Sequence, residues 1–472
     1  METLFTAFVS DIANRFVSFL IDKYFKKPGP AMEDPRLLNL QHLLCRVCAV
    51  VEEAEGRNIT NRAMVHQLNM WRKEMYRGYF TMDKFRIQAG EEDKSKDLDV
   101  SHPFALSKFS PYKRFFSSTG VAHGEKELQQ VIDNLNTITA HMSEFITFLN
   151  NYTPLYRQPY GMHLILDKCM FGRQMEMERI INFLMLVEPQ STKNVGVLPI
   201  VGPCLTGKST IVAHVCNDER VRNNFTQIVF ITENDLEDKS VTALNDGGAI
   251  VHKNNSLNGN ERVLIVIELS ENVDEAALKS YLASVTCLAS VVKIIITSRS
   301  GKIVNSGTTQ ALLLNFLPIE AFWYFFKVLT FGSADPTDHP KLESIAMEIS
   351  RDISGSFLGA NIISSFLRDN IHYKHWCTLQ ANLRALIKNN VCLSAHDRPK
   401  SRPTYLRSMD NTVAFSVYGY RENSADDTVP NMRFSDVLFR SVKSGTRFEV
   451  LAWQSRIPPY KNYMYSCEVQ SI

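Results

Sequence analysis

Residues 202–209 of this chain read Gly-Pro-Cys-Leu-Thr-Gly-Lys-Ser, and they stand between an apolar run and a helical pattern. Gly202 and Gly207 allow the backbone to approach a phosphate closely, so that amides at the start of a helix point at its oxygens. We expect Lys208 to reach the terminal phosphates and the Ser209 hydroxyl to complete the coordination shell of Mg²⁺. A chance glycine-rich turn is the alternative, and the order of strand, loop and helix disfavours it. The stretch therefore predicts a nucleotide-binding loop.

From Gly172 onward the chain alternates short β-branched runs with helical segments. Continuous apolar runs are typical of parallel strands that helices cover on both faces. The runs expected as strands are 195–201, 228–232, 263–267, 292–297 and 312–316. A further helical pattern lies between Asp335 and Asn370. We therefore expect a P-loop parallel sheet over 165–330, in an α/β arrangement, and a helical subdomain over 331–395.

An acidic residue ends one of these strands, as is common in proteins with a phosphate loop. The run 263–267 ends at Glu268, which we expect to hold magnesium through water. The alternative is that Glu268 only ends an apolar strand. The next residue, Leu269, cannot orient a water molecule as a second carboxylate would. Glu268 is thus the catalytic candidate of a protein that we expect to be at most a slow ATPase.

Arg299 follows the run 292–297 at the expected carboxyl edge of the sheet, where ligands bind in α/β folds. It could sense the terminal phosphate of a nucleotide, or it could be a solvated arginine after a strand. The residues alone leave both interpretations open.

The first 150 residues carry helical patterns with apolar stripes. Helices are expected near 4–20, 34–55, 60–88 and 124–150. Such stripes must pack against each other or against a partner, so a four-helix bundle over 1–150 is predicted. The polar stretch 90–97 and the proline-containing stretch 101–120 are expected to form a loop.

The rest of the chain gives weaker signals. From Ser401 short aromatic and β-branched runs alternate with turns, which indicates a small β-rich tail over 400–472. Cys45 and Cys48 form a CxxC within an apolar helix, where core packing is favoured over zinc or redox chemistry. His396-Asp397 is read as a polar loop, and the mixture of basic and aromatic residues at 108–116 as a loop packing its aromatics.

Composition excludes several classes of function. The net charge of +2 gives no general drive toward nucleic acid or anionic membrane. No run of 18 or more apolar residues exists that could form a transmembrane segment. The nine cysteines are mostly scattered, which favours a reducing, intracellular compartment.

The order of these motifs resembles a known family, the plant intracellular immune receptors in which a coiled-coil domain precedes an NB-ARC nucleotide switch. The resemblance covers roughly residues 1–370, and the N-terminal bundle is similar to the Rx-type domain of grass receptors. The matching stretches are Phe171-Gly172-Arg173-Gln174-Met175-Glu176, Gly202 to Thr210, 217–225, 263–268, 294–299, and 314–318 with Trp323 and Phe326.

What the resemblance implies is a cytoplasmic switch in plant disease resistance that binds ADP or ATP with Mg²⁺. It would act through protein partners of the bundle, including further copies of itself. By resemblance, the base is lined by Phe171, Gly172 and Arg173; the phosphates and Mg²⁺ are held by Gly202, Pro203, Gly207, Lys208, Ser209 and Thr210; Glu268 assists the metal; and Arg299 senses the terminal phosphate.

The chain also departs from the family pattern. The family's Gly-Leu-Pro-Leu motif is replaced by Gly355-Ser356-Phe357-Leu358-Gly359, and its acidic third-helix motif is reduced to Met82-Asp83. His396-Asp397 stands too close to Gly355 to be the family's later His-Asp motif, and no leucine-rich repeats follow. The sequence therefore indicates a truncated or divergent member. A degenerate scaffold that regulates full-length receptors is the alternative to a switch, and a turnover NTPase is disfavoured by Leu269.

Overall fold

The computed structural model describes residues 34–55, 57, 59, 61–97, 118–152, 170–186, 195–233, 249–253, 262–271, 274–285, 291–353, 355–388, 404–407, 414–424, 428–439, 447–455 and 457–470. These residues belong to two compact units, which are treated separately below. The first takes its described residues from Met1–Tyr160, Ile319–Lys327 and Ala334–Met347. The second takes them from Gly161–Pro318, Val328–Ser333 and Glu348–Ile472.

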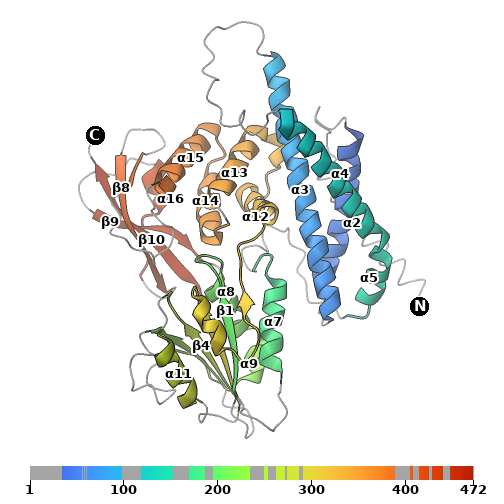
Figure 1. Cartoon of the computed structure of the whole chain (residues 1–472). Helices are drawn as coiled ribbons and strands as arrows, with labels where there is room; N and C mark the ends of the chain where they lie inside the picture. Colours follow the sequence, from blue (N-terminus) through green and yellow to red (C-terminus); the bar gives the residue numbers. More distant parts are fainter. Residues whose placement is uncertain are drawn as a thin grey trace. The chain divides into compact units, whose positions relative to one another are not determined.

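The N-terminal part of the first unit is helical, as the sequence predicted (Figure 1). Its helices are α2 (Pro35–Glu55), α3 (Arg62–Asp97), α4 (Ser118–Ala140) and α5 (Met142–Leu149). Asp34 caps α2 by accepting the Arg36 amide at 2.8 Å, which is why this helix begins where expected. The helix expected at 4–20 lies outside the described residues.

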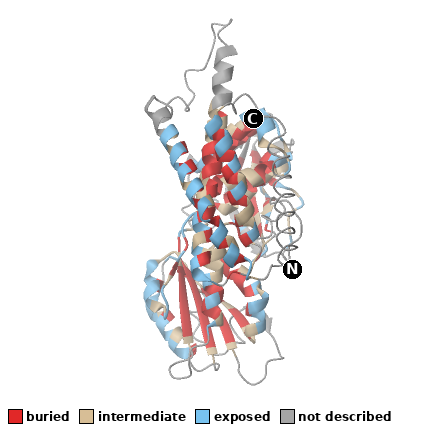
Figure 2. Cartoon of the chain, turned by 90° about the vertical axis from the view of Figure 1, so that its right-hand side faces the viewer, coloured by how far each residue is buried: buried red, intermediate tan, exposed pale blue. Residues whose placement is uncertain are grey.

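The bundle core lies where the apolar stripes of these helices meet, and buried positions line one side of each helix (Figure 2). Leu44 of α2 and Leu135 of α4 are almost fully buried, and both lie beside Gly78 of α3. A Cβ at Gly78 would lie 2.6 Å from Leu44 Cδ2, so glycine allows α3 to approach α2 closely. Trp71 and Phe145 close the core with ring centroids 4.6 Å apart.

The expected loop at 90–97 was wrong, because α3 continues as a helix to Asp97. The stretch carries glutamate and lysine, which have high helix propensity, and no proline that would end the helix. The start of α4 at Ser118 is also earlier than the residue expected. The stretch 101–117, including the whole mixture of basic and aromatic residues at 108–116, lies outside the described residues.

The second unit contains a six-stranded sheet of order β3-β2-β4-β5-β1-β6. Its strands are β1 (Val195–Val201), β2 (Gln227–Thr232), β3 (Ala249–Lys253), β4 (Arg262–Glu268), β5 (Val291–Ser298) and β6 (Leu312–Leu313). Strands β2, β4, β5, β1 and β6 run parallel, and β3 pairs antiparallel with β2 at one edge. The predicted parallel sheet is confirmed, and β3 is an addition that the sequence analysis missed.

Both faces of this sheet are covered (Figure 1), which explains why its strands read as continuous apolar runs. One face packs against α7 (Gln174–Met185), α8 (Lys208–Asn217) and α9 (Glu219–Asn224). The other packs against α11 (Glu275–Ser284) and η5 (Gly301–Ser306). Alternate residues of β4 enter the two cores, for example Leu264 on one face and Ile265 on the other.

The last predicted strand, 312–316, is shorter than expected because β6 ends at Leu313. The Leu314 amide still donates to Val201 O of β1 at 2.8 Å, and the next carbonyl, Asn315 O, accepts a hydrogen bond from the Arg173 side chain. The segment 314–318 is therefore a loop that packs at the sheet edge.

A helical region and a second sheet complete the described residues. The remaining elements are α12 (Ile319–Phe331), η6 (Pro336–Asp338), α13 (Pro340–Asp352), α14 (Phe357–Asp369), α15 (Tyr373–Lys388), α16 (Phe434–Phe439), and strands β7 (Thr404–Arg407), β8 (Ala414–Ser424), β9 (Arg447–Gln454) and β10 (Lys461–Gln470). The four strands form an antiparallel sheet of order β7-β8-β10-β9, which confirms the predicted β-rich tail. Within the second unit, Phe434 of α16 joins Phe366 of α14 to Tyr465 of β10, at 5.5 and 5.1 Å between ring centroids.

Across the part of the chain that the structure describes, no helix combines the length and the apolar character needed to cross a bilayer. The domain boundaries expected from the sequence stay predictions.

Candidate nucleotide-binding site

The phosphate loop, residues 202–209, connects the end of β1 to the start of α8, and its shape depends on glycine. A Cβ at Gly202 would lie 2.2 Å from the carbonyl oxygen of Leu314, which is closer than any contact allows. Gly207 has φ +86° and is the N-cap of α8. Thr206 Oγ1 donates to Pro203 O at 2.9 Å and closes the loop on itself. The sequence analysis gave no separate role to Thr206 or Leu314, whose atoms lie closest to the position of a Cβ at Gly202.

The start of α8 leaves backbone donors at the loop. The Ile211 amide donates to Gly207 O at 2.9 Å, and the amides before it have no acceptor one turn earlier in the helix. These are the amides of Lys208, Ser209 and Thr210, in the first turn of α8 (Lys208–Asn217). The arrangement offers an anion both the hydrogen-bond donors and the positive end of a helix dipole.

The Lys208 side chain folds over the loop. Its Nζ donates to Gly202 O at 2.8 Å and to Pro203 O at 2.7 Å. Burial lowers the pKa of Lys208; the positive charge of Arg299 acts in the same direction, and the Glu268 carboxylate opposes it. Two basic side chains, Lys208 and Arg299, thus adjoin the loop, which suits it to an added negative charge such as a phosphate.

The ends of β1, β4 and β5 bring Glu268 and Arg299 to the same edge of the sheet as the loop. Glu268 is in register with Thr297, and Val201 with Ser298. Arg299 lies against the loop, with its Nη2 3.1 Å from the sulfur of Cys204. The structure thus brings Arg299 to the loop, although neither of its two possible roles is tested by this contact.

Leu269 is part of the sheet core. It is buried, its amide donates to Thr297 O at 2.9 Å, and it belongs to the apolar cluster on the α11 face. An apolar side chain in that position offers no acceptor to an attacking water molecule. Glu271, two residues farther on, is exposed.

The lead-in residues 171–173 lie beside the segment 314–318. Phe171 is buried, and Gly172 has φ +68° with the Leu317 side chain 3.1 Å from the position of a Cβ. Arg173 is also buried; it donates to Asn315 O and, at 3.1 Å, to Glu176 Oε1. Burial lowers the pKa of Arg173 while the Glu176 carboxylate opposes this. Its Nε is buried without a hydrogen-bond partner among the described residues.

Two side chains that sequence reasoning missed complete this side of the loop. A Cβ at Gly207 would lie 3.3 Å from Met170 Cε and 4.0 Å from Phe357 Cδ2. The Arg173 guanidinium stands 5.8 Å from the centre of the Phe357 ring. Phe357 comes two residues after Gly355, which has φ +82°. The glycine is the signal in the sequence that the chain can turn here. An aromatic ring therefore stands where the family pattern has a proline.

These residues fit a nucleotide with Mg²⁺. The loop has no side chain at Gly202 or Gly207 to exclude a phosphate, the basic side chains of Lys208 and Arg299 adjoin it, and so do apolar side chains. Mg²⁺ would take oxygen ligands from Ser209 and the phosphates, with Glu268 acting through water. No cluster of three or more His, Cys, Asp or Glu side chains that could hold a metal without a nucleotide occurs within the described ranges.

The other sequence candidates lie elsewhere or are not described. Cys48 is buried in α2, as its interpretation as core predicted, and burial raises the pKa of both Cys48 and Cys45. His396-Asp397 lies outside the described residues.

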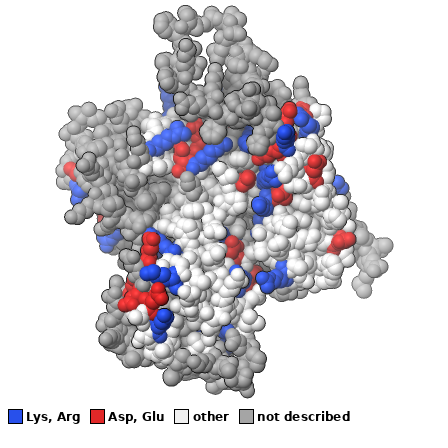
Figure 3. Space-filling model, in the orientation of Figure 1, with Lys and Arg blue, Asp and Glu red and all other residues white. Residues whose placement is uncertain are grey.

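On the face drawn in Figure 3, acidic and basic side chains of the described residues are interspersed.

The parallel strand order β2-β4-β5-β1-β6, with a glycine-rich loop after β1 and an acidic end to β4, defines a P-loop-like fold. No family model matches the chain. It is 23% identical over 385 residues to a putative disease resistance protein RGA1 of Solanum bulbocastanum, covering 78% of this chain and 37% of that protein. It is 23% identical over 381 residues to disease resistance protein RGA2 of the same plant, covering 76% of this chain and 37% of that protein.

A shorter similarity points to the same group of proteins. A putative disease resistance RPP13-like protein 1 of Arabidopsis thaliana is 24% identical over 227 residues, 48% of this chain and 21% of that protein. The chain is thus distantly related to plant disease resistance proteins. It spans a little over a third of the length of the first two.

Proposed function

We propose that this chain binds ADP or ATP with Mg²⁺ at the phosphate loop and acts as a nucleotide-dependent switch in plant defence signalling. The observation that carries the proposal is the loop itself. Glycines at 202 and 207 keep side chains away, α8 starts with amides free of helical acceptors, and Lys208 lies over the loop. The distant relationship to plant disease resistance proteins supports the biological setting.

Within this proposal each group has a physical task. The amides of the α8 start and Lys208 bind the phosphates, and Ser209 with Glu268 holds Mg²⁺, which supplies charge neutralisation when bound. Arg299, already in contact with Cys204 of the loop, senses the terminal phosphate. The residues Met170, Phe171, Arg173 and Phe357 bound the space for the base.

The expected turnover is slow. Leu269 packs in the core next to Glu268 and cannot orient water, so hydrolysis would lack a positioned base. A ligand shifts a conformational balance only through its different affinities for the two states. A protein that holds its nucleotide for a long time is suited to such a balance, and signalling would pass to protein partners of the helical bundle in the cytoplasm.

The second candidate is a scaffold that keeps the fold but has lost the switch. The observation that favours it is Phe357, whose ring adjoins Gly207 and faces Arg173 where the family has a proline. A bulky ring there would fill space that a base needs. In that case a nucleotide would at most stabilise the native state by mass action.

The test is to purify the full chain gently, denature it, and identify released nucleotide by chromatography. Lys208→Ala is compared with Lys302→Ala, since Lys302 is an exposed lysine of η5, the element that directly follows β5. We expect stoichiometric ADP from the wild type and from Lys302→Ala, and none from Lys208→Ala. Retained nucleotide in Lys208→Ala would reject the assignment of the loop. A wild type that is empty and binds neither added ADP nor ATP would leave the scaffold as the better account.

A further inference from the structure

The C-terminal sheet has no task in the nucleotide site described above, although it belongs to the same compact unit as the phosphate loop. Its strands β9 and β10 are joined by a turn over residues 455–460. This turn lies at the end of the sheet that points toward α8 and β1 (Figure 1). Its contacts show how the sheet reaches the residues that support the loop.

Ser455 gives the β9–β10 turn a fixed shape. Its amide donates to Lys461 O at 2.9 Å, which closes the hairpin. Its hydroxyl is buried; it donates to Ile457 O at 2.8 Å and accepts from the Ile457 amide at 3.4 Å. Ile457 O also accepts a hydrogen bond from the Tyr460 amide at 2.9 Å. Four hydrogen bonds among these residues therefore hold Ile457 in one position within the turn.

The Ile457 side chain packs against the core of the other sheet. It is half-buried, and its contacts are with the apolar cluster on the α8 face of the parallel sheet. Met170 and Ile211 belong to the same cluster. Met170 Cε lies 3.3 Å from the position of a Cβ at Gly207, and the Ile211 amide donates to Gly207 O. The turn thus packs on the cluster that supports the phosphate loop at Gly207.

A second route joins the C-terminal sheet to the same glycine. Phe357, the first residue of α14, has its Cδ2 4.0 Å from the position of a Cβ at Gly207. Farther along α14, Phe366 packs on Phe434 of α16, and Phe434 packs on Tyr465 of β10. These last three rings are buried. The sheet therefore contacts both the cluster that contains Met170 and the helix that carries Phe357.

Support at Gly207 affects binding because this residue is the N-cap of α8 and has φ +86°. Glycine has wide conformational freedom when nothing holds it. Affinity falls in proportion to the fraction of molecules whose site already has the binding conformation. Contacts that order the loop before a ligand arrives therefore raise affinity without touching the ligand.

We propose that the C-terminal sheet positions the phosphate loop, because the β9–β10 turn and α14 hold Met170 and Phe357 against Gly207. Ile457 is a positioning residue, since it acts through the apolar cluster and not on a nucleotide. The effect on affinity rests on the proposed function, whereas the effect on the order of the loop does not. The β-rich tail is then an integral part of the nucleotide-binding unit. A separately folded appendage would leave α8 unaffected by changes in the turn.

The test compares Ile457→Ala, Ile457→Val and Tyr460→Asn in the full chain, by amide hydrogen exchange over 208–217 and by calorimetric titration with ADP. We expect Ile457→Ala to speed exchange over 208–217 about tenfold and to weaken ADP affinity about tenfold. Ile457→Val keeps a branched apolar side chain and should recover most of both losses. Tyr460→Asn is the matched control and should resemble the wild type. Tyr460 lies in the same turn, its side chain is exposed, and asparagine tolerates its φ of +53°.

Wild-type exchange over 208–217 in Ile457→Ala would overturn the positioning role, and so would wild-type ADP affinity in a chain that binds ADP. Equal effects of Ile457→Ala and Tyr460→Asn would also overturn it, because the whole hairpin would then have loosened. If the wild type binds no ADP, the proposed function fails separately, and exchange over 208–217 alone decides. If Ile457→Ala does not fold, Phe434→Leu tests the second route: faster exchange over 208–217 supports the proposal, and wild-type exchange there refutes it.

Discussion

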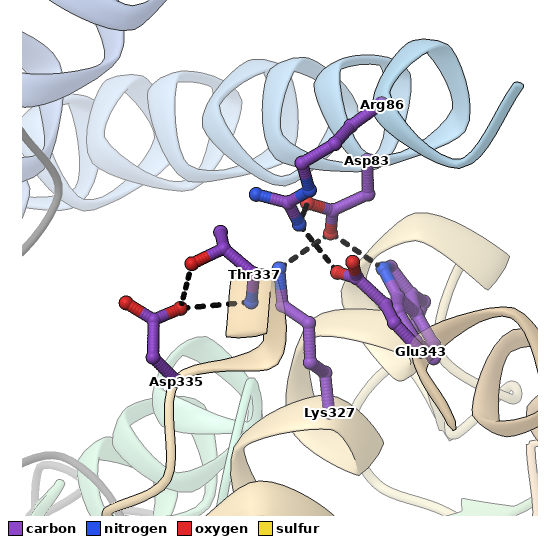
Figure 4. Close-up of polar contacts among 7 residues, drawn as sticks. Asp83, Arg86, Lys327, Asp335, Thr337 and Glu343 are labelled. Atoms are coloured by element: carbon purple, nitrogen blue, oxygen red, sulfur yellow. Dashed lines mark hydrogen bonds and ion pairs between the residues drawn. The ribbon is translucent and has the colours of Figure 1, made fainter. Parts of the chain in front are cut away.

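The phosphate loop and a buried network in the first unit are both rich in polar groups, but they differ in how charge is balanced. This network, the α3 cluster, consists of Asp83, Arg86, Trp323, Lys327 and Glu343 (Figure 4). At the phosphate loop, Lys208 donates to the backbone oxygens of Gly202 and Pro203, and Arg299 contacts the sulfur of Cys204. In the α3 cluster two acids meet two bases, and the hydrogen bonds run between them. The first arrangement is suited to an external anion. The second is complete in itself, which is typical of a structural contact.

The two regions also differ in the part of the residue that determines the geometry. The loop depends on backbone and on the missing side chains of Gly202 and Gly207. The cluster depends on long side chains that reach across from three helices. Substitutions should therefore act in opposite ways: added atoms should damage the loop, and removed charges or donors should damage the cluster.

The largest effect is expected for Gly202→Ala. Its Cβ would lie 2.2 Å from the Leu314 carbonyl oxygen, so backbone must move, at a cost of about 3 kcal/mol. Nucleotide binding should be lost with it. Gly301→Ala is the control, because a Cβ there meets nothing within 4 Å. Thermal unfolding and ADP titration would compare the two, and equal behaviour would contradict the role given to Gly202.

A smaller effect is expected for Trp323→Phe in the cluster. The indole of Trp323 donates to the charged Asp83, and that of Trp376 donates to the carbonyl oxygens of Leu367 and Asn370. Hydrogen bonds to charged groups contribute about 1.5–3 kcal/mol, and neutral ones about 1 kcal/mol. Both indoles are almost fully buried, so Trp376→Phe controls for lost ring volume. Chemical denaturation should show the greater loss for Trp323→Phe, and a greater loss for Trp376→Phe would argue against a charged Asp83.

Local patterns were sufficient to predict much of the fold. The apolar stripe and the cap at Asp34 predicted α2. Continuous apolar runs predicted the ends of β1, β2, β4 and β5 to within about one residue. The phosphate loop was found because its residues are consecutive in sequence. Such features depend on neighbours in the chain, which periodicity and motif spacing report directly.

Features that depend on tertiary contacts were not predictable. Asp83 was recognised only as the remainder of an acidic motif, since its partner Trp323 lies 240 positions away. Phe357 was taken as the loss of a proline, and its position beside Gly207 follows only from the packing of α14. Just beyond the end of β6 at Leu313, Asn315 accepts a hydrogen bond from Arg173, 142 positions away, which no local pattern shows.

Glu343→Gln should change the pH dependence of stability. An acid whose pKa is raised above its ordinary value of 4.5 gains a proton first in the folded state, so it favours folding as pH falls toward that value. Protonation of Asp83 has the opposite effect on stability. Because the pKa of Asp83 is lowered in the folded state, the stability that its charge contributes is lost only as pH falls below 3.8. As pH falls from neutral toward 4.5, the wild type should therefore gain stability relative to Glu343→Gln. Thermal midpoints against pH would show this, with the exposed Glu144→Gln as control; parallel curves for wild type and Glu343→Gln would contradict it.

The smallest effect is expected for Cys204→Ser, because the loop would bind phosphate through backbone and Lys208. The thiol of Cys204 is in contact with Arg299 Nη2 at 3.1 Å, and a serine hydroxyl can accept the same hydrogen bond. ADP affinity should change by less than about threefold, well under the tenfold change that 1.4 kcal/mol produces. Calorimetric titration with ADP measures this, and the loss of affinity in Lys208→Ala, measured in parallel, shows how large a full effect is. A loss in Cys204→Ser as large as in Lys208→Ala would mean that side chains rather than backbone form the phosphate site, and the contrast with the α3 cluster would no longer hold.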